Sequence, residues 1–243
     1  MKTTIGSYSF KTESYLLGAN GRLSFPTLFN YLIHAASAHA TERGFGFVDM
    51  TNQHTAWVLS RMAIEVVAYP TFDQSITVYT WVDEVNKLFT CRNFQLCNAA
   101  GESIAWARSI WAAIDLQTRK PTLLDIEGLS SYLVPERPCP ISKPSKIKPI
   151  EQTSVGVEYT VKYSDLDINN HLNSAKYIEH LLDLFPLEKF ENQQIQRFEI
   201  AYMAEGQYGM SLSLHHAAEN DTTDLLAVCH EGKTICRAKA IWK

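Results

Sequence analysis

The chain has 243 residues, of which 46% are hydrophobic and 20% are charged, and its formal net charge is −4. This composition is ordinary for a globular protein of one large or two smaller domains, and the slight acidic balance does not favour a nucleic-acid partner. No run of 18 or more apolar residues predicts a membrane span, and the first residues have neither the apolar core of a signal peptide nor the arginines of a transit peptide. The five cysteines are scattered without a CxxC pair, so we expect no disulfide framework and no zinc site, and a reducing cytoplasm as the compartment.

The first half of the chain predicts a strand at Ser7–Tyr15 and then an amphipathic helix from about Phe25 to Arg43. Ser24 is a suitable N-cap for this helix, and Gly44 is a suitable terminator. Segments that alternate apolar and polar residues follow, as half-buried antiparallel strands do. We expect these strands at Ala56–Val67, Ser75–Glu84, Leu88–Asn98 and Ser103–Asp115.

A proline-rich stretch then separates the two halves. Residues Leu116 to Gln152 hold six of the nine prolines, a density that favours extended segments and disfavours a helix or a central strand. The sequence therefore predicts an N-terminal domain at 1–117, a linker at 118–152 and a C-terminal domain at 153–243.

The second half predicts the same series of elements. A strand at Val155–Tyr163 leads to a helix at Ser174–Phe185, which Pro186 ends. Further strands are expected at Gln194–Met203, Met210–His216, Leu225–His230 and Thr234–Trp242.

Three segments of the first half match segments of the second half, in the same order. The matches align Gly101–Trp111 with Gly232–Trp242, Arg61–Ile64 with Arg197–Ile200, and Tyr31–His34 with Tyr177–His180. Three ordered matches indicate a duplication, in which each copy is a long helix packed on a curled antiparallel sheet. The predicted fold is therefore α+β, of a tandem hotdog type.

A polar run before the second helix is the strongest candidate for chemistry. Asp167, Asn169 and His171 are spaced by two, so extended backbone would turn all three side chains to one side. They precede a helix start, where free N–H groups can bind an oxyanion. The helix match carries the three positions back to Gly21, Leu23 and Phe25, which have no comparable group. It also makes His34 and His180 equivalent, both with a packing role.

Glu205 is a second polar feature that only the second copy carries, because the strand match aligns it with Tyr69. These differences place the reactive groups in the second copy and leave the first copy to hold an apolar ligand.

Two other interpretations of the polar run are weaker. Its start resembles a calcium-binding EF-hand loop, but the positions that require glycine and glutamate are Asn170 and Lys176. Helix capping by Asn173 or Asn170 would explain one such residue and not the whole set.

The chain as a whole resembles the acyl-acyl carrier protein (acyl-ACP) thioesterases of plants and bacteria. The resemblance covers most of the sequence and is most specific in the run from Tyr163 to Asn173 that continues into Lys176-Tyr-Ile178. In the first half it rests on Trp57–Met62, Tyr69-Pro70, Thr80–Val82, Gly101-Glu102, Ser109–Trp111 and Thr118-Arg119. It implies a tandem hotdog fold and hydrolysis of the acyl thioester on the phosphopantetheine arm of the carrier protein.

The resemblance also implies the site residues. The family's reactive set falls on Asp167, Asn169, His171 and Glu205, while the cysteine that follows the glutamate in plant members is Gly206 here. We therefore expect Glu205 to act as a general base on water, with no covalent intermediate, no cofactor and no metal. An acyl-CoA thioesterase, a hydratase or dehydratase, and a non-catalytic acyl sensor are the alternatives. A monomer or a homodimer is expected, with neither membrane nor nucleic acid as partner.

Overall fold

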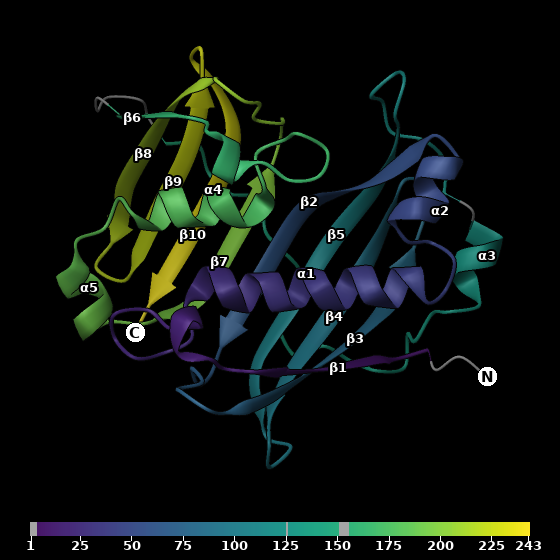
Figure 1. The fold of residues 1–243 in the computed structure, drawn as a ribbon, viewed down its shortest axis with the longest axis horizontal. Coiled ribbons are helices and arrows are strands. Elements are labelled where there is room, and N and C mark those ends of the chain that lie inside the picture. The colour runs from purple at the N-terminus through teal and green to yellow at the C-terminus, as the bar shows by residue number, and fades with distance from the viewer. Residues whose placement is uncertain (1–3, 125, 151–155) are drawn as a thin grey trace. The chain divides into compact units, whose positions relative to one another are not determined.

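The computed structural model describes residues 4–124, 126–150 and 156–243. The chain divides into two compact units, Met1–Pro144 and Ser145–Lys243. In Figure 1 the first unit is coloured from purple to teal and the second from green to yellow.

The first unit is an antiparallel sheet with one long helix against it (Figure 1). Neighbouring strands follow the order β1-β3-β4-β5-β2. Helix α1 begins after Ser24, whose hydroxyl accepts the Thr27 N–H, and it buries Leu28, Phe29 and Leu32. The elements are β1 (Gly6–Lys11), η1 (Ser14–Leu16), α1 (Phe25–Thr41), α2 (Phe47–Asn52), β2 (Thr55–Val66), β3 (Ser75–Val85), β4 (Phe89–Asn98), β5 (Ser103–Asp115) and α3 (Ile126–Ser130).

The second unit repeats this plan. Its strand order, β6-β8-β9-β10-β7, is that of the first unit position by position. Its long helix buries Tyr177, Ile178 and Leu181. The elements are β6 (Val157–Thr160), η2 (Tyr163–Asp165), α4 (Ser174–Leu182), α5 (Leu187–Asn192), β7 (Ile195–Tyr202), β8 (Ser211–Asn220), β9 (Thr223–His230) and β10 (Lys233–Trp242). The predicted α+β tandem fold is confirmed.

The two copies align through their helix caps rather than through the helix sequences. Ser24 and Asn173 are the two N-caps, and the antiparallel bridges Leu17–Leu23 and Leu166–Leu172 precede them. Asp167, Asn169 and His171 therefore correspond to Gly18, Asn20 and Arg22. The predicted correspondence to Gly21, Leu23 and Phe25 is wrong, because matching Tyr31 with Tyr177 shifted the helices by almost one turn.

This shift has two consequences. The amide at Asn169 has a counterpart, Asn20, in the first copy, so only part of the polar set is confined to the second copy. Counted from the caps, His180 corresponds to Tyr31, and the predicted equivalence of His34 and His180 is wrong.

The proline-rich stretch packs against the first unit over much of its length. The Val134 N–H donates to the Val82 carbonyl oxygen at 2.8 Å, and the Trp81 indole donates to the Arg137 carbonyl oxygen at 3.1 Å. The expectation that this stretch holds no helix is wrong, because α3 occupies the long gap between Pro121 and Pro135. The end of the predicted linker, from residue 151, and the start of the next predicted strand at Val155 lie outside the described residues.

The short helices α2 and α5 were not predicted, and both first strands are shorter than predicted because 3-10 turns follow them. No helix in the described ranges is long and apolar enough to span a bilayer.

Candidate active site

Residues Asp167 to His171 form a tight turn just before α4. The Asp167 N–H donates to the His171 carbonyl oxygen at 2.8 Å, and the Asn170 N–H donates to the Asp167 carbonyl oxygen at 3.0 Å. Asn170 has a φ of +60°, a left-handed conformation that asparagine tolerates better than most residues. The expectation of extended backbone with all three polar side chains on one side is therefore wrong: the run folds back on itself.

The Asp167 carboxylate holds this turn from within. Its Oδ1 accepts the Asn169 N–H at 2.8 Å and the His171 N–H at 3.1 Å. An aspartate that binds backbone N–H groups two to four residues ahead stabilises a turn in the manner of an Asx turn. Asp167 thus fixes the backbone of His171, while Asn169 is exposed at the tip of the turn.

His171 and Glu205 come together across two segments of the second unit. His171 Nε2 lies 3.4 Å from Glu205 Oε2, and their side chains are 22% and 36% exposed. The contact depends on the segment after β7, where the Gly206 carbonyl oxygen accepts the Leu172 N–H at 2.8 Å and Gln207 forms a bridge with His171. An imidazole and a carboxylate that are half-exposed and adjacent can share a proton and activate a water molecule.

Gly206 is buried beneath this pair. Its N–H donates to Tyr177 Oη at 2.8 Å, and burial raises the pKa of the Tyr177 hydroxyl, which keeps it protonated. A Cβ at position 206 would lie 3.0 Å from Leu172 Cβ and 3.1 Å from Tyr177 Oη, closer than ordinary contacts allow. A side chain at position 206 therefore requires Leu172 or Tyr177 to move by a few tenths of an ångström.

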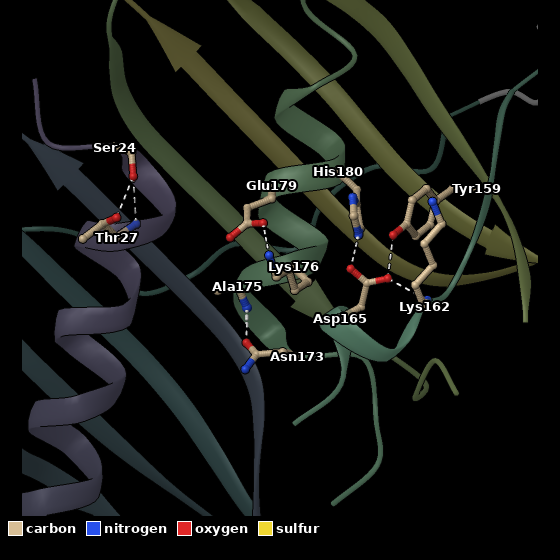
Figure 2. Close-up of polar contacts among 10 residues, drawn as sticks. All are labelled: Ser24, Thr27, Tyr159, Lys162, Asp165, Asn173, Ala175, Lys176, Glu179 and His180. Carbon is tan, nitrogen blue, oxygen red and sulfur yellow. Dashed lines mark hydrogen bonds and ion pairs between the residues drawn. The ribbon is translucent and has the colours of Figure 1, made fainter. Parts of the chain in front are cut away.

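The N–H groups at the start of α4 already have acceptors. Asn173 Oδ1 accepts the Ala175 N–H at 2.9 Å, as Figure 2 shows, and the Asn173 carbonyl oxygen accepts the Lys176 N–H at 2.9 Å. The sequence predicts that N–H groups at the helix entry bind an oxyanion, but these two donors are already occupied. The exposed Asn169 amide is therefore the stronger candidate for an oxyanion donor.

Over the ranges that the structure describes, no three His, Cys, Asp or Glu side chains gather in a way that could hold a metal ion.

Family profiles match both units. The profile of the acyl-ACP thioesterase N-terminal domain matches residues 6–132, and that of the C-terminal domain matches residues 147–243. The chain belongs to the acyl-ACP thioesterase family. The two profiles follow one another in the same order as the two structural units, so membership extends over nearly the whole chain.

Solved structures of this family agree with the fold. An acyl-ACP thioesterase from Bacteroides thetaiotaomicron is 42% identical, with a TM-score of 0.93 over 99% of this chain and 98% of that one. A 12:0-ACP thioesterase from Umbellularia californica has a TM-score of 0.90 over 100% of this chain and 98% of that one, at 20% identity, which supports the fold alone.

Among curated relatives, a chloroplastic palmitoyl-acyl carrier protein thioesterase from Gossypium hirsutum is 28% identical over 98% of this chain and 63% of its own length. A chloroplastic acyl-[acyl-carrier-protein] hydrolase from Cuphea viscosissima is 31% identical over 81% of this chain and 51% of its own length. The chain thus spans less than two thirds of the length of these relatives.

Proposed function

We propose that this acyl-ACP thioesterase family member hydrolyses the thioester of fatty acyl-ACP and releases free fatty acid and holo-ACP, as a step of fatty acid biosynthesis. The observation that carries the proposal is the 3.4 Å contact between His171 Nε2 and Glu205 Oε2, on a turn held by Asp167. Family membership of both units supports the substrate class.

In the proposed reaction Glu205 takes a proton from a water molecule, whose oxygen attacks the thioester carbonyl carbon. The Asn169 amide donates to the oxyanion that develops on the carbonyl oxygen. When the C–S bond breaks, the proton held by the His171–Glu205 pair passes to the departing thiolate. No covalent bond to the protein forms, which is compatible with glycine at position 206. Asp167 acts through the backbone of His171.

The acyl chain is assigned to the first unit. That unit lacks the reactive set, because Gly18, Arg22 and Tyr69 stand where the second unit has Asp167, His171 and Glu205. Its helix α1 turns a continuous apolar face towards the sheet. The division into an acyl-binding domain at 1–117, a linker at 118–152 and a catalytic domain at 153–243 stays a prediction.

The test is release of free thiol from acyl-ACPs of graded chain length, with acyl-CoAs as competing substrates. We expect thiol release with a preference for acyl-ACP. Preference for acyl-CoA would show that ACP is the wrong carrier in this proposal. Turnover of an enoyl or 3-hydroxyacyl thioester without free thiol would favour a hydratase or dehydratase, and acyl binding without turnover would favour a sensor. Sedimentation of the same sample distinguishes the two expected oligomeric states, a monomer and a homodimer.

A further inference from the structure

A buried carboxylate, Asp165, lies two residues before the reactive turn. The Asp165 side chain is 4% exposed, and Figure 2 shows its three partners. Its Oδ2 accepts the Tyr159 hydroxyl at 2.5 Å and the Lys162 N–H at 2.8 Å, and its Oδ1 accepts His180 Nε2 at 3.2 Å. Buried carboxylates are rare unless their oxygens are satisfied in this way.

Asp165 connects the turn to two other elements. Tyr159 lies on β6 and His180 lies on α4. The carbonyl oxygen of Asp165 also accepts the N–H of Asn173, the residue that caps α4. Asp165 therefore connects the chain just before the turn to β6, to the side of α4 and to the residue that caps α4.

The first unit provides an internal comparison. The residues that correspond to Tyr159, Asp165 and His180 are Phe10, Leu16 and Tyr31. Phe10 and Tyr31 stack with ring centroids 4.2 Å apart, and Tyr159 and His180 repeat that contact at 4.0 Å. The first unit therefore has an equivalent pair of rings, but the apolar Leu16 stands at the position of the Asp165 carboxylate.

The polar network is not required to form the turn itself. In the first unit the Gly18 N–H donates to the Arg22 carbonyl oxygen at 2.8 Å, the same distance as in the reactive turn. That turn has glycine at its left-handed position, Gly21, where the reactive turn has Asn170. A residue with a Cβ costs on the order of 1 kcal/mol in this conformation. The unit that contains the network is therefore the one whose turn has Asn170 in the strained conformation and carries the reactive side chains.

We propose that Asp165, together with Tyr159 and His180, is a positioning network that holds the Asp167–His171 turn in register with Glu205. The inference rests on the proposed function. Asp165 lies two residues before the turn and binds Asn173, two residues after it, so the network holds the segments that flank the turn and does not touch the reacting atoms. A displacement of the turn by about 1 Å would lower the rate by up to about a hundredfold, because proton transfer depends on geometry.

The ionisation of Asp165 is consistent with this role. Burial raises the pKa of its carboxyl group, but the hydrogen bonds from Tyr159, from the Lys162 N–H and from His180 outweigh burial and lower the pKa below its ordinary value. The group is therefore a carboxylate at neutral pH, and its three donors remain satisfied.

The second unit offers a matched control. Asp224 is also 4% exposed, and its oxygens accept His216 Nε2 and Lys189 Nζ, each at 2.6 Å. Asp224 lies on β9 and is paired with the partly exposed His216 on β8, both outside the reactive turn. Asp165→Asn and Asp224→Asn thus remove equivalent charges from the same unit.

The experiment compares kcat, KM, melting temperature and amide hydrogen exchange of the two variants, with the assay run well below both melting temperatures. We expect Asp165→Asn to lower kcat about tenfold with KM within about twofold, and to speed exchange of the Asp167 and Asn170 N–H groups. Asp224→Asn should lower the melting temperature and leave kcat and those N–H groups unchanged. Equal effects of the two variants on kcat and exchange would overturn the proposal.

A triple variant keeps the test decisive if Asp165→Asn is poorly folded. Tyr159→Phe, Asp165→Leu and His180→Tyr together copy Phe10, Leu16 and Tyr31, of which the two aromatic rings stack in the first unit. We expect it to fold and to have a reduced kcat. Full wild-type kcat in this variant would show that the network does not position the turn. The exchange measurement needs no substrate, so it distinguishes failure of this inference from failure of the proposed reaction.

Discussion

His171 in the second unit and Arg22 in the first unit occupy the same position of the same turn. Each carbonyl oxygen accepts the N–H four residues earlier, from Asp167 and Gly18, and each residue bridges the segment that follows the second strand of its unit, at Gln207 and Thr71. The protein therefore holds two turns of one backbone design with different side chains.

Removal of either member of the His171–Glu205 pair should abolish most activity. We expect His171→Ala and Glu205→Ala each to lower kcat at least about a hundredfold, the usual scale for general acid–base groups. The measurement is thiol release from acyl-ACP. Tyr69→Phe, at the position that corresponds to Glu205, is the control and should keep wild-type kcat. Wild-type rates in both alanine variants would remove the site assignment.

The kcat should depend more on the acceptor oxygen of the Asp167 side chain than on its negative charge. Asp167→Ala leaves the N–H groups of Asn169 and His171 without their acceptor, and we expect kcat to fall about a hundredfold as the turn shifts. Asp167→Asn keeps one acceptor oxygen and should lose only about tenfold. A comparison of kcat for the two variants tests this, and equal losses would mean that the negative charge matters rather than the hydrogen bonds.

A side chain at Gly206 should disturb the site rather than improve it. Gly206→Cys brings a Cβ to 3.0 Å from Leu172 Cβ and 3.1 Å from Tyr177 Oη, so we expect a loss of about 1–3 kcal/mol in unfolding free energy and a lower kcat. Denaturant unfolding and thiol release measure the two effects. Gly206→Ala should behave alike, because the Cβ is what clashes. A Gly206→Cys enzyme faster than wild type would show that the cysteine serves as a nucleophile.

His39 should make the protein acid-sensitive below neutral pH. Burial, together with the nearby guanidinium groups of Arg92 and Arg43, lowers the pKa of His39 to about 3. The unfolded chain binds a proton below its ordinary histidine pKa of roughly 6.5, whereas the folded protein does not until about pH 3. Stability is therefore complete above about pH 6.5 and falls as the pH drops, by about 2 kcal/mol between pH 7 and pH 5.

Urea unfolding at the two pH values measures this loss. His39→Gln removes the titrating group while it retains polar atoms for Arg92, so its stability should be lower at pH 7 and should change less between pH 7 and pH 5. An unchanged pH dependence in the variant would contradict the assignment to His39.

Most of the fold could be predicted from the sequence because each strand carries its own signal. Ser103–Asp115 is a mostly apolar run that begins after the turn at Gly101, and β5 has those bounds. Ser24 was readable as a cap because its hydroxyl lies before a helical pattern and accepts a local N–H. The short helices α2 and α5 were missed, since six residues give too few turns for a periodic pattern.

The candidate site was predicted as a set of residues but not as a geometry. The spacing of Asp167, Asn169 and His171 suggested extended backbone, whereas the N–H groups of Asn169 and His171 donate to Asp167 Oδ1 and close a turn. The partners of Asp165 come from β6 and α4, and nothing in the sequence relates Tyr159 to His180 until the helix packs. Aligning the two N-caps, Ser24 and Asn173, would have revealed Asn20 and the Phe10–Tyr31 counterpart of that pair.

The two units use the same backbone turn, at residues 18–22 and 167–171, with different side chains, and this has a practical consequence for engineering. The five positions from Gly18 to Arg22 show that this backbone accepts glycine, asparagine and arginine without the carboxylate anchor behind it. A short cassette between two bridged leucines can thus be exchanged while the surrounding sheet is left alone, so libraries confined to residues 167–171 should yield folded proteins of altered reactivity.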